Sequence, residues 1–219
     1  MAHDGRAPRW LSWLERRVGW LAIPQLGILL VTLQALGFLM ILASPNYYFL
    51  LALEPHAVMA GQVWRVVTFL SLPLTTSPLW LIFTLWFMYF VVNTLEAEWG
   101  AFRATFYVLV SVVVTVAYSF ATGYPVTDIS HFESSLFLAA AALYPEYEVS
   151  LFMILPIKMK WLALLGVGFL GMELWNGDWG TRGLLAATYS NYLIFFGPLH
   201  LDQIKSAIRR RRNRGRFGR

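Results

Sequence analysis

The sequence predicts an all-α integral membrane protein that crosses the bilayer six times. Of its 219 residues, 58% are hydrophobic and only 13% are charged, and the mean hydropathy is +0.57. Soluble domains carry about 25% charged residues, so this composition is typical of a membrane protein. Six segments have the apolar character expected of membrane helices, and the distribution of basic residues favours an even number of crossings.

The six predicted spans form one membrane domain over residues 23–200. They cover residues 24–43, 79–96, 103–122, 132–144, 160–175 and 181–199. The first span ends before Pro45 and the third before Pro125, because proline cannot continue a helix. The fourth span is short and unusually rich in small residues.

Basic residues determine the predicted orientation. If both termini are cytoplasmic, all but two of the 17 lysines and arginines lie on the inner side, the exceptions being Arg65 and Arg182. This asymmetry is what the positive-inside rule expects, whereas an odd number of spans would place one basic terminus outside. The compact chain further favours a bacterial cytoplasmic (inner) membrane as its location.

Two cytoplasmic flanks border the membrane domain. Residues 1–22 contain RWLSWLERRVGWL, whose apolar residues recur at helical spacing, so we expect an amphipathic helix in the headgroup layer. Residues 201–219 form a basic tail, whose final segment IRRRRNRGRFGR (208–219) we expect to be too charged to fold and to bind anionic lipid. Its lipid-facing residues would be Arg209, Arg210, Arg211 and Arg212. Beside a membrane span, no nucleic-acid partner is expected for this tail.

The connection between the first two spans, residues 44–78, is too apolar for an ordinary outer loop. Its aromatic and leucine side chains need burial, yet Pro45, Pro55, Pro73 and Pro78 prevent a continuous span. Irregular backbone at membrane depth persists only where protein or trapped water satisfies its polar groups. We therefore expect a structured, half-submerged element that packs against the helices.

Three segments resemble the rhomboid superfamily in order and spacing. They are GQVWRVVTFLSLP (61–73), LEAEWGAFR (95–103) and LFMILPIKMKWLALL (151–165). The resemblance extends over about residues 20–200 and implies a rhomboid-like bundle whose first outer loop dips into the bilayer, as in intramembrane serine proteases. We expect Trp64 and Arg65 to anchor this loop to the helix bundle, with the guanidinium bound by backbone carbonyls.

The catalytic residues that the resemblance would imply are mostly missing. The nucleophile of rhomboid proteases lies in a Gly-x-Ser-Gly motif, and its position falls on Ser134, but Phe132 and Ser135 replace the glycines. The sixth span holds no histidine to serve as the base, since His200 lies at its cytoplasmic end. A serine hydroxyl is a weak nucleophile without a base in hydrogen-bond reach. His131 precedes Ser134 by three residues, but we expect it to be solvated at the outer interface. The sequence therefore predicts a pseudoprotease in which Ser134 is vestigial.

Small and polar residues supply the remaining structural candidates. We expect the fourth and sixth spans to pack closely through Ser135, Ala139, Ala142, Gly183 and Ala187. Gln34 and Asn191 should form hydrogen bonds between helices. Arg182 should pair with Glu173 or Glu133, because a charge at membrane depth is costly and usually paired; the alternative places all three in the wet interface.

The predicted function is binding of transmembrane segments of partner proteins without catalysis, in membrane-protein quality control, trafficking or stabilisation. This function is what the resemblance implies for an inactive relative. The alternative is a fixed accessory subunit of a larger membrane complex, with some of the 10 tryptophans and 16 phenylalanines forming a permanent interface. A third hypothesis is an active intramembrane serine protease that uses Ser134. No metal or cofactor is expected, since the four histidines lack metal-ligand spacing and cysteines are absent; the expected partners are lipids and transmembrane helices.

Overall fold

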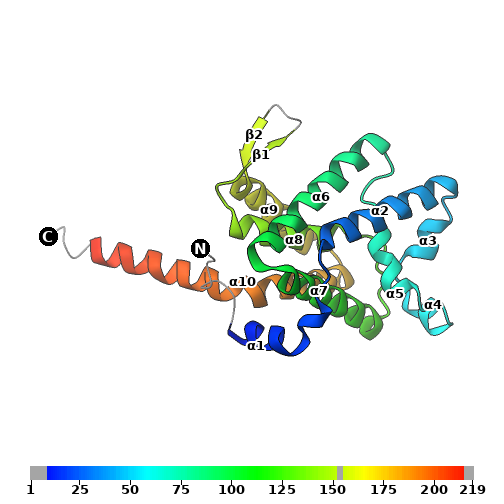
Figure 1. Cartoon of the computed structure of the whole chain (residues 1–219), viewed down its shortest axis with the longest axis horizontal. Coiled ribbons are helices and arrows are strands. Elements are labelled where there is room, and N and C mark those ends of the chain that lie inside the picture. The colour runs from blue at the N-terminus through cyan, green and yellow to red at the C-terminus, as the bar shows by residue number, and fades with distance from the viewer. Residues whose placement is uncertain (1–8, 152–154, 215–219) are drawn as a thin grey trace.

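The structure is a computed structural model that describes residues 9–151 and 155–214, and the side chains of residues 11–149 and 156–197. This part of the chain is mostly helical (Figure 1). Within it, three helices are long and apolar enough to cross a membrane, namely α2 (Leu26–Ala43), α6 (Pro78–Trp99) and α7 (Ala101–Thr122). The prediction of a helical protein with membrane-spanning segments is confirmed to this extent.

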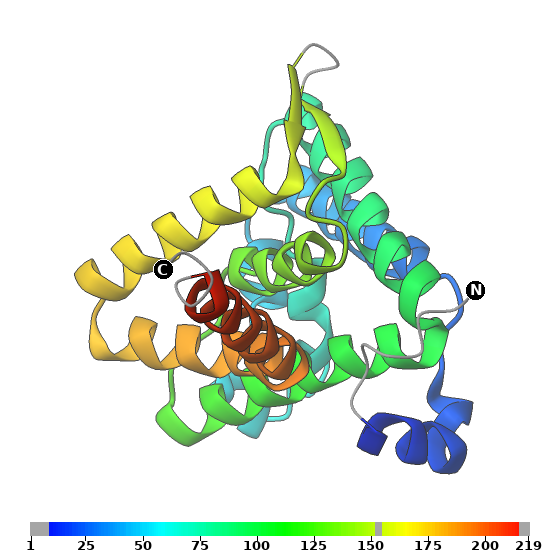
Figure 2. The same ribbon diagram turned by 90° about the vertical axis from the view of Figure 1, so that its left-hand side faces the viewer.

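Three further helices complete the bundle, namely α8 (Ser130–Leu143), α9 (Met159–Asn176) and α10 (Trp179–Arg214). Helix α8 lies at the centre of the bundle, as Figure 2 shows. Its 14 residues rise about 1.5 Å each, or roughly 21 Å in total. That length is well below the hydrocarbon thickness of about 30 Å. The neighbours of α8 are α6, α9 and α10, and most of its side chains are buried.

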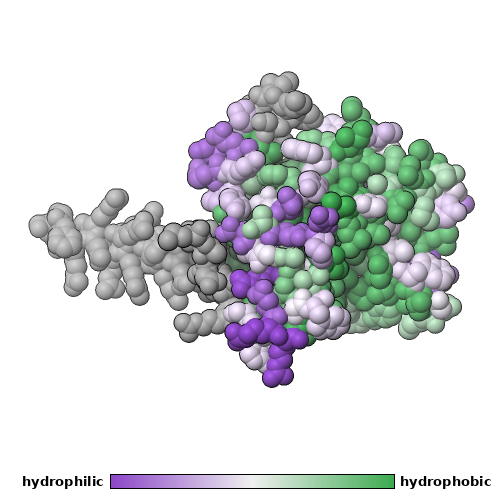
Figure 3. Space-filling view, viewed as in Figure 1, coloured by the Kyte–Doolittle hydropathy of each residue, from purple (hydrophilic) through white to green (hydrophobic). Residues whose placement is uncertain are grey.

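Hydrogen bonds and ion pairs tie the helix ends together at one end of the bundle. The backbone N–H groups of Gln25 and Leu26 donate to the carboxylate of Glu96 over 2.8 and 3.1 Å. Helix α1 (Arg9–Val18) joins this end through the ion pair of Arg103 with Glu15, 3.1 Å apart. The C-terminal part of α10 also projects from this end, at the left of Figure 1. Hydrophilic residues gather there, whereas apolar residues dominate the rest of the face drawn in Figure 3.

Residues 44–78 are structured at the opposite end of the bundle. They contain α3 (Tyr47–Leu51), α4 (Pro55–Met59), α5 (Arg65–Thr68) and the 3-10 helix η2 (Phe69–Ser71). Leu53 pairs with Val126 through a short antiparallel bridge, and Tyr48 donates to the carbonyl of Thr127 over 2.6 Å. Apolar side chains such as that of Phe69 are buried in the common core. This part of the chain, hereafter the outer element, therefore packs against the connection between α7 and α8.

One glycine permits the closest approach between the outer element and α2. An added Cβ at Gly37 would lie 2.8 Å from the carbonyl carbon and 3.1 Å from the Cβ of Ser71. Any larger side chain would force α2 and η2 apart, because carbon atoms in contact are normally about 3.5–4.0 Å apart.

Two segments differ from the sequence-based expectations. Strands β1 (Glu148–Leu151) and β2 (Leu155–Lys158) form an antiparallel hairpin between α8 and α9 that was not predicted. The expectation that residues 208–219 are too charged to fold is wrong for their described part, since α10 continues to Arg214. Arginine, lysine and glutamine are good helix formers, and an existing helix propagates readily. The side chains of Arg209, Arg210, Arg211 and Arg212 lie outside the described residues, as does that of His200.

An exposed charge cluster closes the base of the hairpin. Glu146 accepts hydrogen bonds from the ammonium groups of Lys160, at 2.5 Å, and Lys158, at 2.9 Å. These bonds lower the pKa of Glu146 to about 2, with Lys160 contributing most. The pKa of Lys158 is raised by the same contact with Glu146.

Candidate functional site

A cavity of about 280 Å³ lies between α6 and α8 and is partly open to the surface. Its walls are mainly apolar, lined by Leu74, Phe83, Phe87, Met88, Val91, Leu136 and Phe137. Its polar lining consists of Thr84 on α6 and Ser130, Glu133 and Ser134 on α8. An apolar cavity with a few convergent polar groups is the usual form of a binding site. We call this space the α6–α8 cavity.

The first turn of α8 places these polar groups. The side chain of Asp128 accepts a hydrogen bond from the backbone N–H of Ser130, which fixes the start of the helix. Phe132 then points into the core, whereas Leu136, which is also buried, forms part of the cavity wall. Glu133 and Ser134 lie on the remaining face and line the cavity.

Glu133 lies close to the mid-depth of the bundle. It accepts a hydrogen bond from the amide Nε2 of Gln34, a fully buried residue. Gln34 is near the midpoint of α2, which is itself long enough to span a membrane. Glu133 therefore lies far from either end of that helix. The interhelical bond expected for Gln34 is present, and its partner is an ionisable residue.

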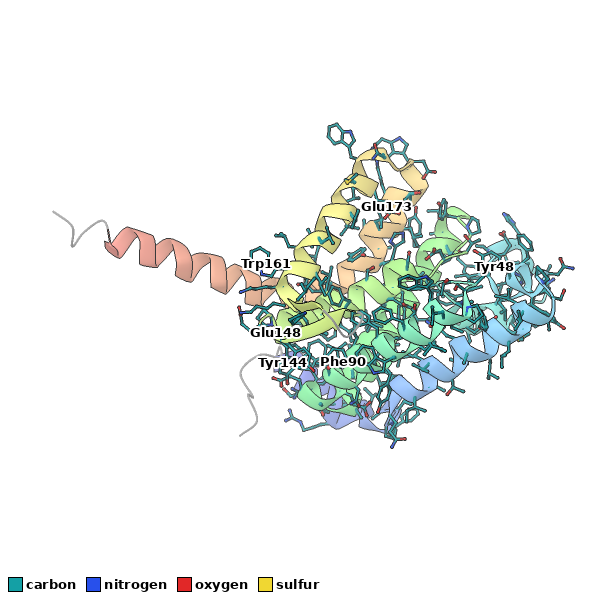
Figure 4. The ribbon with its side chains drawn as sticks, turned by 90° about the horizontal axis from the view of Figure 1, so that it is seen from above. Tyr48, Phe90, Tyr144, Glu148, Trp161 and Glu173 are labelled. Carbon is teal, nitrogen blue, oxygen red and sulfur yellow. The ribbon has the colours of Figure 1, made fainter. Side chains whose placement is uncertain are left out.

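Ser134 is hydrogen-bonded to the phenol of Tyr189 on α10. His131 lies one turn earlier, and its Nε2 is 3.2 Å from Oε1 of Glu173 on α9, whose position Figure 4 shows. The imidazole is only 18% exposed, so the expectation of a solvated His131 is wrong. Among the described side chains, no hydrogen bond joins a histidine nitrogen to the hydroxyl of Ser134 or Ser135.

Ser135 faces away from the cavity and into the centre of the bundle. Its hydroxyl is 2.7 Å from the phenol oxygen of Tyr107 on α7, and both residues are fully buried. Asn191 on α10 donates to the backbone carbonyl of Tyr107 over 2.8 Å. This set of bonds joins α7, α8 and α10.

The predicted pairing of Arg182 with Glu173 or Glu133 is wrong. Arg182 donates to the carbonyl of Trp175 over 3.0 Å, and its guanidinium lies 5.2 Å from the ring centre of Trp179. The two acids have other partners, His131 for Glu173 and Gln34 for Glu133. The physical reason is that Glu133 faces α2 and α6, whereas Arg182 lies in the first turn of α10 and reaches back to the end of α9.

The predicted small-residue positions are divided between two interfaces. Helix α8 does contact α10, and Ala139 is fully buried whereas Ala142 and Ala187 are half-buried. Gly183, however, lies against α7, because an added Cβ there would be 2.7 Å from the ring of Tyr118. Gly183 therefore permits close contact with a tyrosine of α7 and not with the fourth span.

Arg65 joins the parts of the outer element. Its guanidinium is buried and donates from Nη1 to the carbonyls of Phe49 and Ala52, the latter over 2.8 Å. Its Nε donates to Oε1 of Gln62 over 2.7 Å. These partners all lie within the outer element, so the expectation that Arg65 anchors the loop to the helix bundle is wrong for the described hydrogen bonds. The neighbouring Trp64 is 50% exposed and takes no part in them.

Sequence reasoning missed Tyr189, the partner of Ser134. It carried no distinguishing pattern, because a tyrosine in an apolar span is common. Glu96 is a second functional residue that the sequence did not reveal, because it caps α2 about 70 residues earlier in the chain. The sequence signal for this cap was the presence of an acid at the end of an apolar helix.

Within the described residues, no group of three histidines or acids could hold a metal ion.

Comparison with known proteins assigns no family to the chain. No protein-family model matches it, and neither a curated protein nor a solved structure matches it. The α6–α8 cavity and its polar residues are therefore the observations from which a function has to be inferred.

Proposed function

We propose that this chain is a rhomboid-like integral membrane protein that binds transmembrane segments of partner proteins and does not cleave them. The observation that carries the proposal is the α6–α8 cavity, which is apolar, partly open and level with the middle of α2, a helix long enough to cross a membrane. A hydrophobic helix could insert apolar side chains into it, as helix-in-groove complexes do. The polar groups on α8 would then meet polar groups of the client.

Six crossings with both termini inside are part of this proposal. Helices α2, α6 and α7 are long enough to span the bilayer. Helix α8 is short, but neighbouring helices cover it, so its ends need not reach either bilayer surface. The bonds that join α1 and Glu96 to one end of the bundle are consistent with an inner face formed by the helix ends on that side.

The position of α9 leaves room for a client helix beside the α6–α8 cavity. Helix α9 contacts α8 and α10, yet Met159 is its one buried residue among those described. Figure 2 shows α6 and α9 on opposite flanks of α8. In Figure 4, α9 leans away from the bundle between Trp161 and Glu173. A client helix that enters between α6 and α9 would reach the cavity beside α8.

The partners of Ser134 and His131 support a non-catalytic role. The serine bonds to Tyr189, and a phenol keeps its own proton at neutral pH, so it cannot take the proton of the serine hydroxyl. His131 is directed toward Glu173 instead. A serine-reactive fluorophosphonate provides the test of the protease hypothesis: labelling of the wild type that disappears in Ser134→Ala would overturn the non-catalytic proposal.

Site-specific photo-crosslinking tests client binding. A photoreactive amino acid at Phe137, in the cavity, should give adducts whose crosslinked peptide maps to a partner's transmembrane segment. The matched control is Val113 on α7, which is 62% exposed. Ser134→Trp, which fills the cavity, should reduce the adducts at Phe137 and leave those at Val113 unchanged. Equal adducts at both positions, or no effect of Ser134→Trp, would contradict the proposal.

A fixed subunit of a larger complex is the second candidate. The exposed apolar side of α9 favours it, with Trp161, Leu165, Phe169 and Met172 each 57–61% exposed. Such residues can face lipid or a permanent partner helix. Purification in a mild detergent separates the two proposals: one partner in constant stoichiometry supports the subunit, and a mixture of single-span clients supports the binder.

A further inference from the structure

The surroundings of Glu133 contain more hydrogen-bond acceptors than donors. Its carboxylate can accept about four hydrogen bonds, and Gln34 is its hydrogen-bond donor among the described side chains. The Oε1 atom of Gln34 is buried and has no partner within the same part of the chain. In the cavity, the hydroxyl of Thr84 already donates to the carbonyl of Trp80 over 2.9 Å, so its oxygen can serve a ligand only as an acceptor.

Basic groups of the described chain do not balance this acid. Lys158 and Lys160 bind Glu146 at the hairpin, while Arg182 is bonded at the end of α9 and Arg65 within the outer element. The nearest other charged groups offer no compensation either. Asp128 carries the same sign as Glu133, and His131 is paired with Glu173.

Membrane depth makes this imbalance significant. Gln34 places Glu133 near the middle of α2, where a carboxylate is costly and is usually paired. The apolar side chains around it, such as Phe83, Phe87 and Met88, suit the aliphatic stem of a long side chain. The cavity thus combines an apolar wall with an acceptor-rich end.

We propose that the α6–α8 cavity selects transmembrane segments that carry a lysine or arginine near their middle, with Glu133 as the residue that determines this specificity. The inference rests on the proposed function, because it presupposes that a client helix lies in the cavity. The basic side chain lays its methylene groups along the α6 wall and directs its N–H donors at Glu133 and the Oε1 atom of Gln34. A client with an acidic residue at the same depth is excluded by like-charge repulsion.

Binding of model peptides in lipid nanodiscs tests the inference. The peptides are leucine–alanine helices of about 23 residues with a single central lysine, leucine or glutamate, and the full-length chain is labelled for energy transfer. The wild type should bind the lysine peptide at least about tenfold more tightly than the leucine peptide. Glu133→Gln should abolish this preference, through weaker binding of the lysine peptide. Glu133→Lys should reverse it in favour of the glutamate peptide.

A matched control separates Glu133 from acids in general. Glu173→Gln removes an acid that already has a partner, His131, and should leave the preference for lysine intact. Glu133→Gln retains the shape of the side chain and an acceptor for Gln34, and a thermal unfolding curve in detergent verifies that the variant folds. If Glu173→Gln lowers the preference as much as Glu133→Gln does, the assignment to Glu133 fails.

The leucine peptide distinguishes failure of this inference from failure of the proposed function. If wild type binds all three peptides equally through the cavity, as crosslinks from Phe137 would show, the proposed function stands and the specificity is refuted. If none of the peptides binds, both are refuted. A peptide with a central asparagine that binds as tightly as the lysine peptide would also overturn the inference, since hydrogen bonding without charge would then suffice.

Discussion

Substitution of Gly37 by alanine should destabilise the contact between α2 and the outer element. The added methyl would lie 2.8 Å from the carbonyl carbon of Ser71 and closer still to its oxygen. These are backbone atoms, so a side-chain rotation cannot relieve the overlap. Overpacking of this kind costs about 1–3 kcal/mol, and the gain in helix propensity from glycine to alanine offsets up to about 1 kcal/mol. We expect a net loss near the upper end, about 2 kcal/mol.

Reversible unfolding in mixed micelles, followed by circular dichroism, measures this loss. Gly168→Ala on α9 is the matched control, because an added Cβ there has no neighbour within 4 Å. It should leave stability unchanged or raise it by up to about 1 kcal/mol. If Gly37→Ala is as stable as Gly168→Ala, the close approach of α2 and η2 is refuted. Rescue of Gly37→Ala by Ser71→Ala would also contradict the reasoning, since that change leaves the carbonyl in place.

Three further predictions concern polar contacts. Arg65→Ala should lower the free energy of unfolding by about 2–4 kcal/mol in the same micelle assay, because the buried carbonyl of Ala52 loses its donor. Glu96→Ala should cost about 1 kcal/mol through loss of the α2 cap, with Glu96→Gln less affected. For Glu146, whose pKa falls from 4.5 to about 2 mainly beside Lys160, the stabilisation is present above pH 4.5 and lost as pH falls toward 2. Thermal midpoints of wild type and Glu146→Gln should therefore differ above pH 4.5 and converge below pH 2. A difference between the two midpoints that stays constant over this pH range would refute the prediction.

The long helices were predictable because their signals are local. The first and third predicted spans, 24–43 and 103–122, differ from α2 and α7 by two residues at one end. Apolar length and the prolines and glycines at the ends suffice for such elements. The C-terminal limit of α10 was not predictable in the same way. A change from apolar to basic residues marks the edge of a bilayer, whereas the backbone hydrogen bonds of a helix continue through it.

The candidate site was predictable only in part, because its geometry depends on the level at which α8 packs against α2. The sequence indicated Ser134 as a position of interest, and Ser134 does line the cavity. It gave no means to know that α8 begins close to the mid-depth of α2. That placement turns Glu133 toward Gln34 and away from Arg182, so the predicted ion pair could not form. Residues far apart in sequence, such as Thr84 and Tyr189, become neighbours of α8 for the same reason.

The position of Glu133 at the start of α8 explains how the fold can hold an acid that has no basic partner at this depth. Glu133 lies in the first turn of α8, where the positive end of the helix dipole favours a carboxylate by about 0.3–1 kcal/mol or somewhat more when partly buried. The dipole and the Gln34 amide offset part of the cost of burying the carboxylate, and no cation of the described chain pairs with it. The carboxylate therefore remains available to a ligand, and neutral glutamine should substitute for it with little loss of stability. A large loss of stability in Glu133→Gln would instead show that the charge has a structural role that a client does not complete.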